Sequence, residues 1–171
     1  TVFAVTGGGA YCSGGPGVPI GLSNSTTGVS YQLYRGTVAV GSPVSGTTGS
    51  AITFGNQTVA GSYTVLGTIT ATGCSINMGG SVSVIINPLP AVFNVTGGGS
   101  YCSGGTGVAI GLANSTSGVS YQLMLAGSPS GSAVSGTGGA ISFGLRTSAG
   151  TYTVIATNTT TTCTNTMTGS A

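Results

Sequence analysis

An internal repeat of about 90 residues is the feature of this sequence that most limits its fold. Residues 1–33 and 91–123 are identical at 26 of 33 positions when the offset is 90. After a one-residue gap the offset becomes 89, and the segments ITFG and AGSYTV of the first copy match ISFG and AGTYTV of the second. This period suits one small domain per repeat, because solenoid repeats are usually only about 20–50 residues long.

Each repeat consists of short apolar runs separated by turn residues. Val29, Tyr31 and Leu33 share one face of such a run, and Ser30 and Gln32 share the other. This alternation predicts β-strands, and clusters of Gly, Ser, Asn and Pro predict the turns between them. The expected strands of the first repeat are 2–6, 18–22, 29–34, 38–40, 51–54, 63–70 and 81–86. Seven short strands predict an all-β protein with tandem immunoglobulin-like, Greek-key β-sandwich domains.

The repeat also predicts the domain boundaries. We expect immunoglobulin-like repeat 1 at residues 1–86, a proline-rich linker at 87–90 and repeat 2 at 91–171. Two prolines within the linker favour an extended, stiff connection. The alignment places Ala171 opposite Val82, so the second repeat lacks most of its last strand. Because an open sheet edge is unfavourable, we expect the chain to be a window on a longer tandem array.

The chain has almost no charged side chains. It contains no Asp, Glu, His or Lys, and Arg35 and Arg146 carry its entire formal charge of +2. General acid–base catalysis draws mainly on the missing residue types, and a serine nucleophile would have no base beside it. Two arginines cannot neutralise a nucleic-acid backbone. We therefore expect no enzyme, no cofactor and no nucleic-acid partner. No membrane span is expected either, because no apolar run reaches the roughly 18–20 residues that a spanning helix needs.

Four cysteines are the candidates for a covalent cross-link: Cys12, Cys74, Cys102 and Cys163. Their wide spacing lacks the short motifs of zinc sites, and calcium or magnesium would need carboxylates, so we expect no metal. Disulfides are the leading interpretation, and they imply an oxidising, extracellular setting. Four free thiols are the alternative.

The expected topology bears on how the cysteines pair. Cys12 follows the first expected strand and Cys74 the sixth, and in an immunoglobulin-type sandwich these loops lie at opposite ends. A strand of about six residues spans roughly 20 Å, whereas a disulfide needs Cα atoms within about 7 Å. We therefore favour a bond between repeats, Cys12 with Cys163, and expect Cys74 and Cys102 to bond to the preceding and following repeats. An intra-repeat bond between Cys12 and Cys74 is the alternative.

Tyrosines and asparagines supply the remaining candidate residues. Tyr63 and Tyr152 begin the sixth strand of their repeats, which is the position of a tyrosine corner. Ordinary half-buried strand tyrosines are the alternative. Asn24 and Asn114 begin Asn-Ser-Thr triplets in equivalent expected loops and are candidate N-glycosylation sites, although such triplets also arise by chance in a threonine-rich chain.

One family resemblance covers both repeats. It rests on the segments VTGGGSYCSGG, GVAIGL, TSGVSYQL, ISFG, AGTYTV and INPLP. These are similar to the tandem immunoglobulin-like repeats of giant secreted surface adhesins and filaments of Bacteroidota. The resemblance implies secretion, through a type IX system, and display at the cell surface or in extracellular filaments that act in gliding, adhesion or matrix building.

Composition, repeat and resemblance together predict a structural role. We expect a repeat of a secreted extracellular fibre or adhesin stalk that is stapled by disulfides. Its expected partners are the neighbouring repeats and further copies of itself. The alternative is a module that binds glycans or surfaces through tyrosine and hydroxyl groups.

Overall fold

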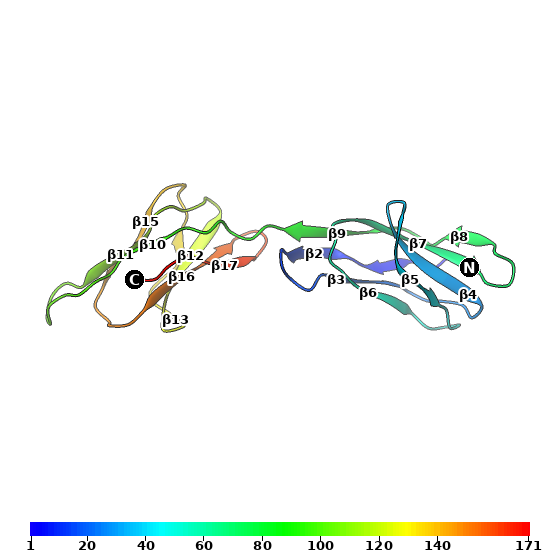
Figure 1. Cartoon of the computed structure of the whole chain (residues 1–171), viewed down its shortest axis with the longest axis horizontal. Helices are drawn as coiled ribbons and strands as arrows, with labels where there is room; N and C mark the ends of the chain where they lie inside the picture. Colours follow the sequence, from blue (N-terminus) through cyan, green and yellow to red (C-terminus); the bar gives the residue numbers. More distant parts are fainter. The chain divides into compact units, whose positions relative to one another are not determined.

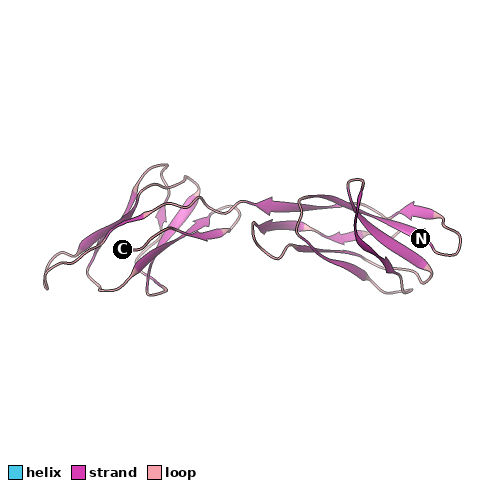
Figure 2. Ribbon diagram, in the orientation of Figure 1, coloured by secondary structure: helices cyan, strands magenta, loops and turns pink.

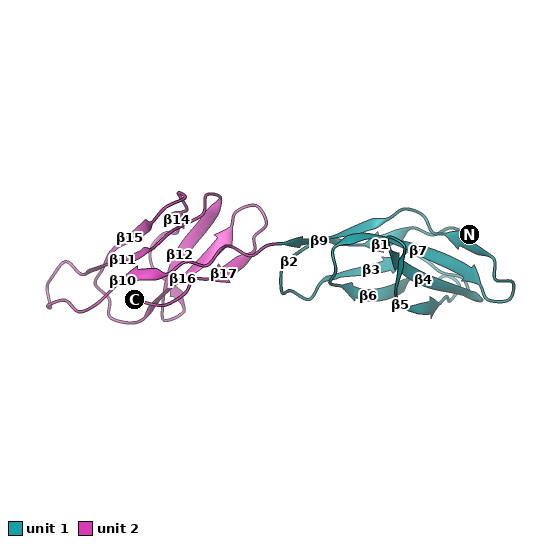
Figure 3. Ribbon diagram, turned by 45° about the horizontal axis from the view of Figure 1, so that its top comes forward, with its two compact units in different colours: residues 1–87 teal, residues 88–171 magenta.

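The computed structural model describes all 171 residues, and every regular element in it is a β-strand (Figure 2). None of its elements is a helix that could cross a membrane. Frequent glycine disfavours helices, because it loses more conformational freedom on folding than any other residue. The chain divides into two compact units, unit 1 at Thr1–Asn87 and unit 2 at Pro88–Ala171 (Figure 3). The division falls inside the segment expected to be a linker.

Unit 1 is a sandwich of two β-sheets (Figure 1). Its strands are β1 (Val5–Gly7), β2 (Gly9–Cys12), β3 (Val18–Leu22), β4 (Val29–Arg35), β5 (Val38–Ser45), β6 (Ile52–Gln57), β7 (Gly61–Ile69), β8 (Ser75–Asn77) and β9 (Val82–Asn87). One sheet has the order β1-β3-β6, and the other has the order β2-β9-β7-β4-β5, with β8 on β7. The all-β, immunoglobulin-like sandwich predicted from the sequence is confirmed.

The core of unit 1 lies between the two sheets. Ile20 and Leu22 enter it from β3, and Tyr31 and Leu33 enter it from β4; each is at most 1% exposed. On β7, Val65 completes the centre of the cluster and is fully buried. These are the alternate positions of the apolar runs, as the sequence predicts. Each such side chain contributes roughly 1.5–3 kcal/mol when it is buried.

The expected strand at residues 2–6 differs most from the structure. Two short strands, β1 and β2, form at residues 5–12 instead, and they belong to different sheets. β1 pairs antiparallel with β3, whereas β2 pairs parallel with β9 in the other sheet. Gly7, Gly8 and Gly9 connect them with φ values of 88°, 73° and 128°, which side chains rarely allow. The sequence predicts turns at such clusters of glycine. They instead carry the chain from one sheet to the other.

Two further strands differ from expectation. β5 continues to Ser45, beyond the expected end at residue 40. β8 was not expected at all, because three exposed residues carry no alternation that a sequence pattern could reveal. It forms because a turn closed by a hydrogen bond from the Ile69 N–H to the Cys74 carbonyl (2.8 Å) reverses the chain onto β7.

Unit 2 repeats this architecture with fewer strands. They are β10 (Val95–Gly97), β11 (Val108–Leu112), β12 (Val119–Leu125), β13 (Ser128–Pro129), β14 (Val134–Ser135), β15 (Ile141–Arg146), β16 (Tyr152–Asn158) and β17 (Thr164–Thr166). One sheet has the order β10-β11-β15, and the other has the order β13-β12-β16-β17, with β14 on β12. Unit 2 has no counterpart of β2 or β9.

A buried serine joins two loops in each unit. Ser25 is 1% exposed, and its Oγ lies 2.9 Å from the carbonyl oxygen of Thr47 and 2.7 Å from that of Ser50. The same Oγ accepts a hydrogen bond from the Thr47 N–H at 3.0 Å. In unit 2, Ser115 is 3% exposed and bonds the Gly139 carbonyl at 2.6 Å. These hydroxyls satisfy backbone groups that would otherwise be buried without partners.

Replacing Ser25 with alanine is expected to lower the free energy of unfolding by about 2 kcal/mol, because several loop backbone groups lose their partner. Urea unfolding followed by circular dichroism measures the change. Ser45 is an exposed serine of β5 and serves as the control, since Ser45→Ala should change stability by less than about 0.5 kcal/mol. Equal effects of the two substitutions would contradict the role of the Ser25 hydroxyl.

Candidate cross-linking site

The four cysteines of the chain are in two different states. Cys12, at the end of β2, and Cys163, just before β17, are disulfide-bonded. Cys74 and Cys102 are free thiols and are exposed. The alternative of four free thiols is therefore wrong. The alternative bond between Cys12 and Cys74 is also wrong, because Cys74 is free.

The strands of unit 1 explain why Cys12 and Cys74 do not bond. Cys12 is level with Asn87, at the end of the sheet where β7 begins, because Gly61 of β7 pairs with Val84 of β9. Cys74 follows the other end of β7. Nine residues separate these ends, a span of roughly 30 Å at 3.3 Å per residue. A disulfide bridges Cα atoms no more than about 7 Å apart.

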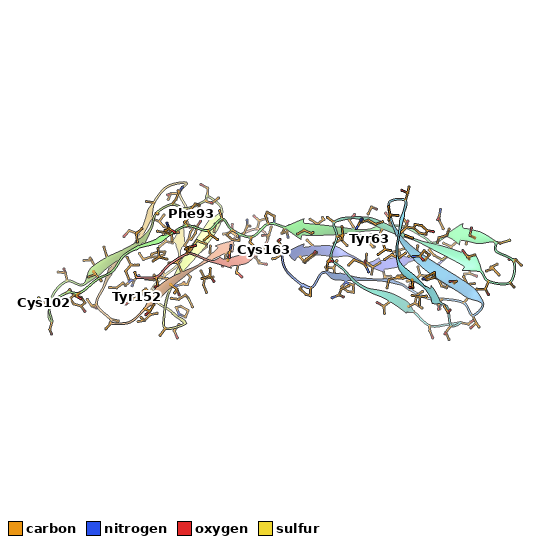
Figure 4. The ribbon with its side chains drawn as sticks, viewed as in Figure 1. Tyr63, Phe93, Cys102, Tyr152 and Cys163 are labelled. Carbon is orange, nitrogen blue, oxygen red and sulfur yellow. The ribbon has the colours of Figure 1, made fainter.

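Unit 2 has its cysteines in the same arrangement. Cys102 lies at the tip of the loop between β10 and β11, and Cys163 lies at the opposite end of this unit, between β16 and β17 (Figure 4). Each unit therefore carries one cysteine at each of its two ends. Cys102 is the counterpart of Cys12, and Cys163 is the counterpart of Cys74.

Equivalent loops hold the free and the bonded cysteine in the same backbone turn. The Ile69 N–H donates to the Cys74 carbonyl at 2.8 Å, and the Asn158 N–H donates to the Cys163 carbonyl at 2.9 Å. Directly before these cysteines, Gly73 and Thr162 have φ values of 73° and 59°. At the other end, Cys12 and Cys102 each accept a bond of 2.9 Å from the glycine three residues later. The free cysteines thus stand on loops shaped like those of the bonded ones.

Both candidate tyrosine-corner residues are buried and hydrogen-bonded. Tyr63 is 1% exposed and its hydroxyl donates to the carbonyl of Val59 at 2.7 Å. Tyr152 is 3% exposed and donates to the carbonyl of Ser148 at 2.9 Å. Both rings lie at the start of the strand that leads away from this contact (Figure 4). Each tyrosine therefore fixes the loop four residues before it.

Replacing Tyr63 with phenylalanine is expected to lower the free energy of unfolding by about 1–1.5 kcal/mol, because the carbonyl of Val59 loses its donor while the ring stays packed. Urea unfolding measures the loss. Tyr34 is half-buried on β4 and gives a matched control, since its hydroxyl makes no such loop contact and Tyr34→Phe should change stability little. A loss at Tyr34 as large as that at Tyr63 would contradict this assignment.

The two candidate glycosylation residues lie in equivalent loops, as expected. The Asn24 side-chain oxygen accepts a bond from the Ser25 N–H at 2.7 Å, and the Asn114 oxygen accepts one from the Ser115 N–H at 2.8 Å. Asn114 is exposed, whereas Asn24 is half-buried. Glycosylation at either residue stays a prediction.

Unit 2 holds a groove that was not among the sites predicted from the sequence. It encloses about 310 Å³ and is lined by glycines of the segment before Cys102 together with Tyr101, Val108, Arg146, Gly150 and Tyr152. The alignment of the two repeats indicates this groove. Strand β9 pairs with β2 and β7 in unit 1, and residues 83–87 of that strand have no counterpart in unit 2 up to Ala171.

Comparisons with known proteins find only remote similarity. No protein-family model and no curated protein matches the chain. Among solved structures, the human OSCAR ligand-binding domain is similar with a TM-score of 0.40 and 12% identity, covering 99% of this chain and 96% of that one. A cytokine receptor complex is similar with a TM-score of 0.30 and 16% identity, covering 91% and 84%. At these scores neither similarity assigns a function to the chain.

Proposed function

We propose that the chain is a pair of structural repeats from a secreted extracellular fibre or adhesin stalk. The observation that carries this proposal is the position of the cysteines, one at each end of each sandwich. Such a unit can be cross-linked to a neighbour at both ends. The immunoglobulin-like fold and the oxidised state of Cys12 and Cys163 are compatible with an extracellular module.

In this proposal Cys12 bonds to Cys163. Both are oxidised while the other two cysteines are free, and the sheet geometry of each unit disfavours a bond within it. The free thiols of Cys74 and Cys102 then serve the same purpose toward the preceding and following repeats. Their loops share the backbone turns of the bonded cysteines, so little rearrangement is needed to form these bonds.

The proposed setting follows from the resemblance to Bacteroidota surface adhesins. The protein would be exported and displayed at the cell surface, where its repeats provide reach and mechanical resistance. Tyr63 and Tyr152 act as tyrosine corners that stiffen each sandwich. Near-zero charge favours contact between copies, which suits a fibre. We propose no catalytic role.

Non-reducing peptide mapping tests the pairing. Chymotrypsin is the suitable protease because the chain offers seven tyrosines and four phenylalanines but only two sites for trypsin. We expect one cross-linked peptide that contains Cys12 and Cys163, which separates into two on reduction. A peptide that joins Cys12 to Cys74 would refute the pairing.

Electron microscopy of the native secreted protein tests the fibre. Thin rods with a repeat of one domain length are expected. Isolated globular particles that bind a glycan on an array would instead favour the adhesive-module alternative. That alternative has little support at Tyr31 and Tyr121, because both rings are buried and their hydroxyls accept backbone N–H groups.

A further inference from the structure

The bonded cysteines close a covalent loop that contains most of the chain. Cys12 and Cys163 are disulfide-bonded and the other two cysteines are free, so the proposed bond joins these two residues. Residues 13–162 then lie inside the loop, and residues 1–11 and 164–171 lie outside it. Tension that pulls the two outer segments apart passes from Cys12 to Cys163 through the sulfur atoms, because this path is much shorter than the backbone between them.

The segment from Ala4 to Cys12 already lies along unit 1. Ala4 forms a parallel bridge with Gly79, and Cys12 is level with Asn87 in the parallel pairing of β2 with β9 (Figure 1). The two segments therefore run side by side, and each advances eight residues between these contacts, a length of up to roughly 26 Å at 3.3 Å per residue. A pull along the first segment finds slack only around Gly8, the one residue between β1 and β2.

The same segment is hydrogen-bonded to both sheets of unit 1. Near its start, the Val5 N–H donates to the Gly79 carbonyl at 2.9 Å, and the Gly79 N–H donates to the Phe3 carbonyl at 2.7 Å. β1 also pairs with β3, and at the far end the Ser13 N–H donates to the Asn87 carbonyl at 2.9 Å. Because hydrogen bonds between strands run across the strands, tension along the segment loads these bonds together and no single bond carries it alone.

The disulfide lies where dissolved thiols reach it slowly. Cys163 is fully buried and Cys12 is half-buried. Thiol–disulfide exchange requires a thiolate to approach one of the two sulfur atoms, so its rate depends on access. Cys74 and Cys102, by contrast, are exposed. Burial therefore slows reduction of the bond that closes the loop.

We propose that residues 1–12 and this disulfide form a tension-bearing tether that carries mechanical load past the folded part of unit 1. Load applied before β1 follows the tether to Cys163, and residues 13–162 stay folded because no tension passes through them. Without the bond, the load would pass along the backbone through both sandwiches and would pull β9 along β2. The inference rests on the proposed pair of Cys12 and Cys163, and it deepens the proposed fibre by assigning the path of the load.

Single-molecule force spectroscopy of the full 171-residue chain, held by tags added at both ends, tests the tether. In the oxidised chain only residues 1–12 and 163–171 can lengthen, so we expect a maximum contour length of about 70–75 Å, at 3.3–3.6 Å per residue. The double variant Cys12→Ser/Cys163→Ser should reach about 560–620 Å, because its whole backbone can lengthen. This length does not depend on how stably the variant folds.

Matched variants separate the tether from other effects on length. Cys74→Ser/Cys102→Ser carries the same number of substitutions, keeps the bond and should lengthen as the parent does. About ten glycine and serine residues inserted after Gly36, in the turn that follows β4, should leave the contour length of the oxidised chain unchanged. The same insertion after Gly8 lies inside the tether and should add about 33–36 Å.

Two results would overturn the tether. One is a step of about 250–270 Å in the oxidised parent, the length of residues 13–87, because unit 1 would then be carrying the load. The other is an equal effect of the two insertions. Both leave the fibre proposal intact, since microscopy decides it, and peptide mapping decides independently whether Cys12 and Cys163 are bonded to each other.

Discussion

Replacing Cys163 with serine is expected to lower the free energy of unfolding by about 2–5 kcal/mol, the usual effect of removing a native disulfide. The cross-link restricts the unfolded chain, so its loss makes unfolding entropically easier. Cys163 is also fully buried, so the serine hydroxyl is placed where the sulfur was packed. Urea unfolding of the oxidised chain measures the difference. A thiol assay should simultaneously find one reactive thiol more than the two of the parent protein, Cys74 and Cys102.

The matched control for this substitution is Cys74→Ser, in the equivalent loop of unit 1. Cys74 is exposed and free, so its replacement should leave stability unchanged and remove one reactive thiol. A double variant of Cys12 and Cys163 should be no less stable than either single variant if the two are partners, because a shared interaction is lost only once. Additive losses would contradict the proposed pair.

The sandwich itself was predictable from the sequence because each central strand alternates cleanly. Tyr31 and Leu33 of β4 are buried, while Ser30 and Gln32 between them face the other way. The repeat strengthened this prediction, since the same alternation recurs in β12. Strand ends were less predictable. β7 begins at Gly61 rather than at residue 63, because the pairing with β9 that starts the strand is a long-range contact.

The parallel pairing of β2 with β9 could not be predicted from local pattern. Gly9–Cys12 contains a single large apolar residue, Tyr11, and becomes a strand because β9 provides its partner. Unit 2 shows this directly, since the nearly identical segment before Cys102 forms no strand there. Secondary structure at this place is decided by tertiary contact, which local periodicity does not encode.

The candidate cross-linking residues were all identified from the sequence, but their states were not. Disulfides were expected from the cysteine number and spacing, and the opposite-end argument disfavoured the bond between Cys12 and Cys74. In the structure Cys12 and Cys163 are disulfide-bonded, whereas Cys74 and Cys102 are free, and the pairing of Cys12 with Cys163 stays a prediction. The groove in unit 2 was missed, although the alignment of the repeats indicates it, because residues 83–87 of β9 have no counterpart up to Ala171.

Replacing Gly7 with alanine is expected to destabilise unit 1 by about 3–4 kcal/mol, because the substitution is opposed in two ways. Gly7 has a φ of 88°, which costs an alanine about 1–2 kcal/mol. The added Cβ would also lie 2.1 Å from the carbonyl oxygen of Pro19, so β1 and β3 must move apart. Because Gly7 is where the chain leaves β1 for β2, this movement also disturbs the crossing between sheets. Urea unfolding and hydrogen exchange of the β2 amides measure the effect.

Gly14 provides the control that separates backbone strain from the steric contact. Its φ of 82° is nearly the same, but a Cβ added there would meet no atom within 4 Å. Gly14→Ala should therefore cost only the conformational part, about 1–2 kcal/mol. Gly97→Ala repeats the test in unit 2, since its Cβ would lie 2.0 Å from the carbonyl oxygen of Ala109. Equal losses at Gly7 and Gly14 would show that the close approach to β3 contributes nothing, and that strain alone holds glycine at the crossing.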